Sequence, residues 1–347
     1  MSLLTYRALV CGLALAACGG SNASKPPAEP AASSQTEATG SQATPGAKSD
    51  ADAKPVEPPA SETASPPQPP KVRLLSPGAA PRHALRYRFA VGPSQWSQMD
   101  MKMAIGVGLG NAVPKPVPLP TVRAAMRIDP KSVSPEGELR YEFEMVKLTV
   151  LRDAPVAAEV RTKLEQELGK LTGLKGYAVV TSRGITKDAD FVVPPDASDA
   201  MQETLENMRS SIRQMSSPLP EEEVGKGAAW EVETQLVTPA FRLTQTATHT
   251  LQDVRPNGMS TRVSFIQNAP RQPMKLKKLP GAKVQLESML STGDGKTEVV
   301  FDKLVPNSLV SLSTNIQMSI AASDGSTGNM AMSMGVATTF QPSKAPH

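Results

Sequence analysis

Apolar and polar positions alternate every second residue along two long stretches of the chain, residues 84–193 and residues 219–343. Alternation with this period is typical of strands that turn one face toward a core. In the first stretch it predicts strands at 85–91, 99–109, 122–128, 138–151, 175–182 and 185–193. In the second stretch it predicts strands at 230–236, 241–251, 259–267, 283–291, 297–301, 309–322 and 330–340.

Interruptions of the alternation predict where these strands bend or end. The apolar parity of the strand at 138–151 changes between Met145 and Val146, which predicts a β-bulge. Asp129-Pro130 predicts a turn, and the glycine-containing segments 253–258, 292–295 and 323–328 predict hairpin turns. Alternate prolines after the second strand predict that it breaks there: Pro114, Pro116, Pro118 and Pro120.

Two segments between these stretches follow the helical period instead. Residues 155–172 begin with a proline and carry apolar side chains at helical spacing. Residues 196–216 carry one apolar stripe at steps of four and three. The order of strands, two helices and strands predicts an α+β fold with a mostly antiparallel sheet, which could be half-barrel-like. The two strand runs form either one body or two subdomains, 84–193 and 219–343.

The amino-terminal segments do not share this pattern. Residues 1–17 combine one basic residue, Arg7, with an apolar run too short to span a bilayer, as secretory signal peptides do. Residues 19–72 are rich in Ala, Pro, Ser, Glu and Thr, and such a segment cannot bury enough apolar surface to become ordered. We therefore expect a signal peptide, a disordered linker from Cys18 to residue 72, a folded body at 73–343 and a tail at 344–347.

The end of the signal segment holds the most specific motif of the chain. Leu15-Ala16-Ala17-Cys18 resembles the lipobox of bacterial lipoproteins. In that family the cysteine thiol receives a diacylglycerol, the peptide before it is removed, and the new amino group is acylated, for example with palmitate. Several acyl chains give stable membrane anchoring. Gly19 and Gly20 stand where enteric lipoproteins of the inner membrane carry an aspartate, so the resemblance implies anchoring of Cys18 in the outer membrane.

Composition limits the chemistry of the mature protein. Of the two cysteines, Cys11 would leave with the signal peptide and Cys18 would carry lipid, so we expect no disulfide, thiol catalysis or cysteine-bound metal. Five of the 37 basic and six of the 33 acidic side chains precede Arg73, which leaves a net charge of +5 on the body. This charge is too small and too dispersed to indicate nucleic-acid binding.

No catalytic constellation is recognisable. Gly106-Val107-Gly108-Leu109-Gly110 precedes proline-rich chain and not a helix, so a flexible strand end fits it better than a dinucleotide-binding loop. The histidines are far apart in the sequence and no nucleophile elbow accompanies His249. We therefore predict a protein that is not an enzyme and has no cofactor and no metal site.

Methionine is concentrated in stripes along a predicted strand and a predicted helix. Methionine fills irregular core space and also lines adaptable apolar binding surfaces. Core packing is the simpler interpretation. The alternative is a lipid or acyl chain held between a curved sheet and a helix, and its lining would then be Met101, Met103, Met201, Leu205, Met208 and Ile212.

The plan of the whole chain is similar to uncharacterised β-rich lipoprotein families of Gram-negative bacteria. It shares with them the lipobox, the proline-rich linker, the segment Leu85-Arg86-Tyr87-Arg88-Phe89, and Leu219-Pro220 before Gly225 and Trp230. This resemblance implies a non-catalytic envelope protein with a structural or interaction role, its partners being the membrane and an envelope protein or lipid. The body is also similar in outline to periplasmic lipoprotein carriers with half-barrel sheets. That resemblance implies the alternative function, a carrier or binder of a lipid or other apolar ligand.

Overall fold

Thirteen strands and one helix are present in the computed structural model, which describes residues 69–193, 202, 205, 218–238, 240–274, 283–322 and 325–346. The first half of the chain forms β1 (Lys71–Ser76), β2 (Gln95–Leu109), β3 (Val117–Val133), β4 (Leu139–Val150), α2 (Ala158–Gly169), β5 (Lys175–Val180) and β6 (Thr186–Phe191). The second half forms β7 (Ala229–Val237), β8 (Arg242–Arg255), β9 (Gly258–Ala269), β10 (Gln272–Met274), β11 (Lys283–Val300), β12 (Asn307–Ala321) and β13 (Thr327–Pro342).

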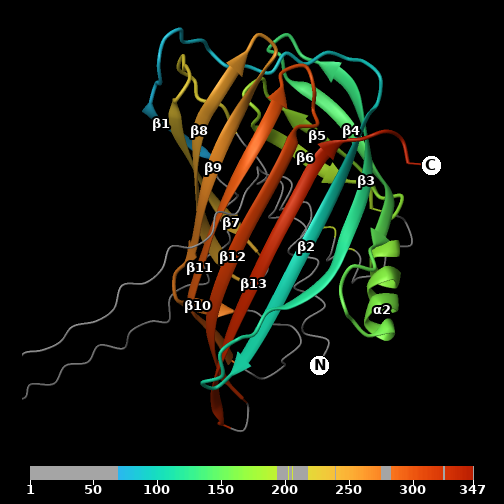
Figure 1. The fold of residues 1–347 in the computed structure, drawn as a ribbon, viewed down its shortest axis with the longest axis vertical. Coiled ribbons are helices and arrows are strands. Elements are labelled where there is room, and N and C mark those ends of the chain that lie inside the picture. The colour runs from blue at the N-terminus through green and yellow to red at the C-terminus, as the bar shows by residue number, and fades with distance from the viewer. Residues whose placement is uncertain are drawn as a thin grey trace, which may run out of the picture. The chain divides into compact units, whose positions relative to one another are not determined.

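All of these strands belong to one antiparallel sheet (Figure 1). Its order is β1-β7-β8-β9-β11-β12-β13-β2-β3-β4-β5-β6, and the short β10 pairs with β11. β13 pairs with β2 from Ser97 to Leu109, so strands from both halves of the chain form one continuous sheet. The mostly antiparallel sheet that the alternation predicts is confirmed.

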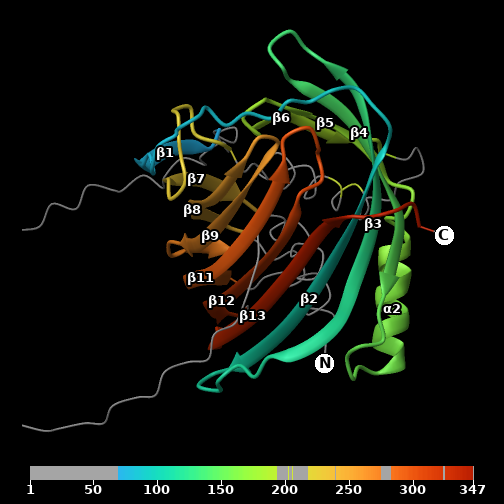
Figure 2. The ribbon, with the colours of Figure 1, turned by 45° about the horizontal axis from the view of Figure 1, so that its top comes forward.

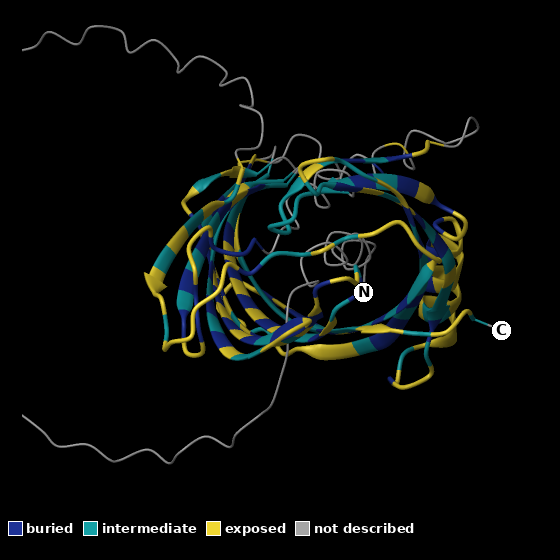
Figure 3. Ribbon diagram, turned by 90° about the horizontal axis from the view of Figure 1, so that it is seen from above, coloured by how far each residue is buried: buried dark blue, intermediate teal, exposed yellow. Residues whose placement is uncertain are grey.

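The sheet curls along this order, so that one of its faces is concave (Figures 2 and 3). The two end strands, β1 and β6, do not pair with each other, and the sheet is therefore open. We call the concave face the inner face; it carries the buried side chains of Trp230, Leu286 and Met101. The outer face is polar, and ion pairs cross its strands between Asp100 and Arg123, Arg127 and Glu144, and Lys131 and Glu142.

Three clusters of buried apolar side chains cover much of the inner face. The helix cluster joins α2 to β2 and β4 and includes Leu164, Leu168, Phe143, Met145 and Met103. The upper cluster lies toward the end where β2 begins and includes Trp230, Val232, Ala247, Phe265 and Leu312. The lower cluster lies toward the end where β2 stops and includes Leu236, Leu243, Leu286, Met289 and Ile316.

Several local predictions are confirmed. The change of parity in β4 is a β-bulge, because Lys147 pairs with Ala125 and Met145 with Met126, which leaves Val146 as the extra residue. The hairpin predicted at 175–193 is formed by β5 and β6. Its turn is closed by Gly184 at φ +79° and by the Thr181 hydroxyl, which accepts hydrogen bonds from the backbone N–H groups of Arg183 and Ile185.

The strand predicted at 85–91 is wrong. This segment is irregular, and the first strand is instead β1, which begins at Lys71. The backbone N–H of Tyr87 donates to the carbonyl of Ser182 and that of Arg88 to the carbonyl of Phe301, two separate parts of the chain. Leu85 is buried, Tyr87 and Phe89 are half-buried and Val91 is exposed, so the alternation at 85–91 reflects a strap that covers the sheet end with its first side chains and not a place in a ladder.

Two turn predictions are also wrong. β11 continues through 292–295, where Gly293 lies so close to β12 that an added Cβ would come 2.1 Å from the carbonyl oxygen of Ser311. β3 includes Pro118, Pro120 and the Asp129-Pro130 pair. Residues 117–119 of β3 pair with β2 but not with β4, Pro120 lies at a register shift between β2 and β3, and a second shift follows Pro130, so each proline stands where the ladder is incomplete.

One helix is described where two were predicted. α2 lies within the predicted range 155–172, and its leucines at helical spacing, Leu164 and Leu168, are the buried ones. Of the helix predicted at 196–216, Gln202 and Leu205 are helical and the remaining residues lie outside the described part of the chain.

Candidate functional site

The inner face is not buried along its whole length. On β2 the side chain of Ile105 is 6% exposed, whereas Val107 and Leu109, further along the same face, are 52% and 70% exposed. On β3, Val117 pairs with Ile105 and is 45% exposed. Large apolar side chains are therefore accessible at the lower end of the inner face.

Methionines of β13 continue this surface. Met330 pairs with Leu109, and Met332 pairs with Val107. Both methionines are only partly buried and pack against the lower cluster. We call Val107, Leu109, Val117, Met330 and Met332 the lower apolar patch. It offers adaptable apolar side chains that continue into the buried lower cluster.

A row of polar side chains crosses the inner face above the lower cluster. The register pairs Thr234 with Gln245, Gln245 with Gln267, Gln267 with Ser291, and Ser291 with Thr314. Each of the five strands β7, β8, β9, β11 and β12 thus contributes one polar residue at the same level. We call these five residues the polar row.

Four members of the polar row are buried and Gln245 is half-buried, and the row is partly paired within itself. Gln267 is 1% exposed and donates from Nε2 to Oε1 of Gln245 at 2.7 Å. The hydroxyl oxygens of Ser291 and Thr314 lie 2.7 Å apart, and these residues are 0% and 4% exposed. These two bonds pair polar groups of the row with each other, so part of the polar surface that the inner face buries is satisfied within the row.

The inner face near the polar row is electrically neutral. Among the described residues, the inner-facing positions of β2, β7, β8, β9, β11, β12 and β13 hold no Lys, Arg, Asp or Glu. His249 does face inward, but burial lowers its pKa to about 4, so it is uncharged at neutral pH. An apolar molecule with neutral polar groups would match this surface, and an ion would not.

The residues predicted to line a ligand site are partly described. Met101, Met103 and Leu205 lie in the helix cluster and are 1%, 5% and 1% exposed. Because they are almost completely buried, they offer little surface to a ligand. Met201, Met208 and Ile212 lie outside the described residues, as does Cys18. The accessible part of the inner face of β2 begins at Val107, two inward-facing positions beyond Met103.

The glycine-rich segment 106–110 is the end of β2 and not a phosphate-binding loop. The segment that follows β2 lies close to the backbone at two of its glycines. A Cβ added at Gly106 would come 2.6 Å from the carbonyl carbon of Lys115, and one at Gly108 would come 1.9 Å from the carbonyl oxygen of Ala112. Gly106 and Gly108 alternate with the inward Val107 and Leu109, so these glycines permit close packing of the loop on the outer side of β2, which the predicted strand-end flexibility does not describe.

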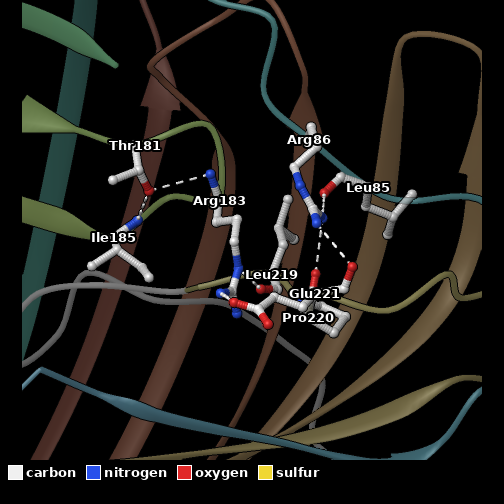
Figure 4. Close-up of polar contacts among 8 residues, drawn as sticks. All are labelled: Leu85, Arg86, Thr181, Arg183, Ile185, Leu219, Pro220 and Glu221. Atoms are coloured by element: carbon white, nitrogen blue, oxygen red, sulfur yellow. Dashed lines mark hydrogen bonds and ion pairs between the residues drawn. The ribbon is translucent and has the colours of Figure 1, made fainter. Parts of the chain in front are cut away.

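A second polar cluster lies at the opposite end of the sheet (Figure 4). Arg183 donates from Nε to the carbonyl of Leu219 at 2.9 Å and pairs with the carboxylate of Glu221. Arg86 donates to the carbonyls of Leu85 and Pro220 at 2.7 and 2.9 Å and to that of Glu221 at 2.8 Å. Burial and the nearby Arg183 lower the pKa of Arg86.

This cluster, which we call the arginine clasp, connects three separate parts of the chain. It joins the strap at 85–88, the β5–β6 turn and the segment 218–221. Its guanidinium groups are bonded to backbone carbonyls and to Glu221, so they are engaged in holding the fold together. The clasp is therefore a structural connection and offers no free cation for a substrate.

Other chemistry has little support in the described part of the chain. His249 stacks on Trp230, and His83 forms an isolated backbone bridge with Val224. Within the described ranges, no three His, Cys, Asp or Glu side chains come together in a way that could hold a metal ion. No described helix is both long and apolar enough to cross a membrane. The sequence matches no protein-family model, and none of the curated proteins matches it.

The polar row was missed in the sequence. A signal for it exists in each strand, because a polar residue interrupts the inward apolar series, as Thr234 does between Val232 and Leu236, although β8, β9 and β12 carry a further inward polar residue each, His249, Thr261 and Ser308. Only the register between strands shows that five such interruptions lie side by side.

Proposed function

We propose that this chain is a lipid-anchored protein of the cell envelope, without enzymatic activity, whose curved sheet binds an apolar ligand on its inner face. The observation that carries the proposal is the exposure of Val107, Leu109 and Val117 on the same face that elsewhere forms the core. Contiguous exposed apolar surface of this kind often marks a binding site.

The surroundings of the lower apolar patch support an acyl chain as the ligand. Met330 and Met332 join the patch to the lower cluster, so a chain that covers the patch can follow apolar side chains into the concavity. Burial of apolar surface contributes about 25 cal/mol per Å², which favours a long hydrocarbon over a small molecule. The neutral inner face removes any need for a charge on the part of the ligand that enters.

The location is proposed from the lipobox. Lipidation of Cys18 would anchor the protein in the outer membrane, and residues 19–70, which precede β1, would separate the body from the bilayer. Fully extended at about 3.1 Å per residue, this linker reaches roughly 160 Å, and much less as a coil. Membrane fractions of cells that express the intact chain should contain the protein, and a Cys18→Ser chain should move to the soluble fraction. Continued membrane association of the Cys18→Ser chain would contradict the anchor.

Native mass spectrometry tests the binding function. The Cys18→Ser chain is purified from the envelope of a Gram-negative host without detergent, and its intact mass is compared before and after extraction with organic solvent. We expect a bound species of lipid mass that the solvent removes. A preparation that carries no adduct, and that gains none on incubation with an envelope lipid extract, would contradict ligand binding and leave an envelope role without a ligand.

A further inference from the structure

We infer that the lower end of the sheet docks on a bilayer that contains anionic phospholipid, with the β2–β3 loop among the headgroups and nearby lysines on the lipid phosphates. This loop comprises residues 110–116. The contact goes beyond the proposed function, because the acyl chains on Cys18 only tether the body through a long linker. Docking of the sheet itself would bring the accessible end of the inner face to the bilayer surface.

Large apolar side chains are exposed in and beside this loop. Val113, in the middle of the loop, is 80% exposed, the highest value among the large apolar side chains of the described residues. Leu109 before the loop and Val117 after it belong to the lower apolar patch and are also exposed. The loop lies at the end of the sheet where β11 begins and β12 ends (Figure 1). An exposed apolar tip of this kind often marks contact with a membrane or a partner.

Prolines lower the cost of placing the loop among lipid headgroups. Three of the seven residues 112–118 are prolines, which have no backbone N–H. Of the four N–H groups that remain in this stretch, the one on Ala112 donates to the carbonyl of Leu109 at 3.1 Å. A backbone N–H that leaves water needs another partner, so a loop with few such groups loses little on entering the headgroup region.

Charged side chains at this end are mostly basic. The segments that form it are 109–117, 237–242, 269–274, 283–287 and 320–327. Their described residues include four basic side chains and one acidic side chain, which leaves a net charge of +3: Lys115, Arg242, Arg271, Lys283 and Glu287. The count excludes residues 239, 275–282, 323 and 324, which lie outside the described part of the chain. Anionic phospholipid headgroups attract a basic surface of this kind.

The register places one of these lysines near the loop. Lys283 pairs with Ala321, and Ala321 pairs with Thr327. Thr327 precedes by three residues Met330, which pairs with Leu109. Lys283 therefore lies at the level of the loop and three strand spacings from the line of β2, which is roughly 14 Å. Because Lys115 is in the loop itself and both lysines are exposed, the two cations and the apolar tip can face one surface.

The charge at this end distinguishes a bilayer from a second copy of the chain. Two copies that met through their lower ends would bring like charges together, which opposes association. An anionic bilayer instead offers phosphates to Lys115 and Lys283, and it offers an apolar region just below the phosphates to Val113.

Flotation with lipid vesicles tests the docking. The mature chain, residues 18–347 with Cys18→Ser so that no acyl group is present, is mixed with phosphatidylcholine vesicles that contain either no anionic lipid or about 30% phosphatidylglycerol. We expect the chain to float with the anionic vesicles and to bind the neutral vesicles at least about tenfold more weakly. Equal binding to the two kinds of vesicle, or binding to neither, would overturn the inference.

One pair of variants tests the apolar tip. Val113→Asp places a charge in the loop, and Val91→Asp makes the same change at an exposed valine of the strap, at the opposite end of the sheet. Val113→Asp should weaken binding to the anionic vesicles by at least about tenfold, and Val91→Asp should leave it unchanged.

A second pair of variants tests the cations. Lys115→Glu with Lys283→Glu reverses two charges at the lower end, one in a loop and one on β11. Lys303→Glu with Lys296→Glu reverses two charges toward the upper end, again one in a loop and one on β11. The lower-end double variant should bind the anionic vesicles at least about tenfold more weakly than the upper-end double variant, although the two have the same net charge.

The outcomes separate docking from ligand binding. All substituted side chains are exposed, so the fold should tolerate the changes, and circular dichroism checks this. Val113 belongs to the loop and not to a strand of the inner face, so Val113→Asp should keep its affinity for the uncharged fluorescent probe 1-N-phenylnaphthylamine. If the lower-end variants float as well as their controls, docking at this end is wrong, although ligand binding stands. If the parent chain floats as expected but does not bind the probe, docking stands and the proposed function fails.

Discussion

The imidazole ring of His249 lies flat against the indole of Trp230, with ring centroids 5.2 Å apart and planes 5° from parallel. The two residues pair across β7 and β8, and both are almost completely buried in or beside the upper cluster. The Trp230 Nε1–H donates to the carbonyl of Pro218 at 3.1 Å, so the stack also holds the segment that enters the arginine clasp. The upper end of the sheet therefore depends on a neutral buried histidine.

Stability should fall in mild acid because of His249. Burial lowers its pKa from 6.5 to about 4, so between these values the unfolded chain holds more protons than the folded one. The free energy of unfolding should therefore be lower by about 2 kcal/mol at pH 5.0 than at pH 7.5, through this group alone. His249→Phe keeps a flat ring against Trp230 and should remove that difference. Urea unfolding of both chains at the two pH values gives the comparison; an equal pH dependence in the variant would contradict it.

The arginine clasp should contribute more to stability than an exposed ion pair does. Arg183→Ala removes the hydrogen bond to the Leu219 carbonyl and the pair with Glu221, and we expect a loss of about 1 to 3 kcal/mol in the free energy of unfolding. Lys131→Ala is the control, since its partner Glu142 is also exposed and such pairs contribute about 0 to 1 kcal/mol. Urea unfolding should give a larger loss in the free energy of unfolding for Arg183→Ala than for Lys131→Ala. Similar losses would show that the clasp contributes no more to stability than an exposed ion pair.

Close packing at the end of β2 should make Gly108 sensitive to a single methyl group. A Cβ there would meet the Ala112 carbonyl oxygen, so Gly108→Ala must displace the loop and should cost about 1 to 3 kcal/mol. Gly92→Ala introduces the same atom where nothing lies within 4 Å and should change stability little. Thermal unfolding of the pair separates steric packing from simple strand-end flexibility, which predicts similar effects at both glycines.

Much of the fold can be predicted from the sequence because strands and bulges leave local signals. The parity change at Val146 and the hairpin at 175–193 depend only on neighbouring residues, and both are found. The strand predicted at 85–91 fails for a physical reason. Alternation reports a buried side, whereas a strand also needs partners for its backbone, and here the N–H groups of Tyr87 and Arg88 bond to separate loops.

The candidate site is harder to predict because it depends on register between distant residues. Glycine is typical of turns, and Gly293 was therefore predicted to lie in one. It lies instead in the middle of β11, where the backbone of β12 approaches it too closely for a side chain. The level at which Gln267 meets Ser291 depends on how β9 and β11 pair, and the pairing of Met332 with Val107 joins residues from opposite ends of the body. No local pattern contains these relationships.

The central claim is that the lower apolar patch binds the ligand, and one pair of substitutions tests it most directly. Leu109→Asp places a charge on the inner face at a side chain that is 70% exposed, so the fold should tolerate it. Leu290→Asp makes the same change at a side chain 52% exposed on the outer face of β11. Titration with 1-N-phenylnaphthylamine should show at least a tenfold loss of affinity for Leu109→Asp and unchanged affinity for Leu290→Asp. Equal affinity of the two variants and the parent chain would contradict binding at the inner face.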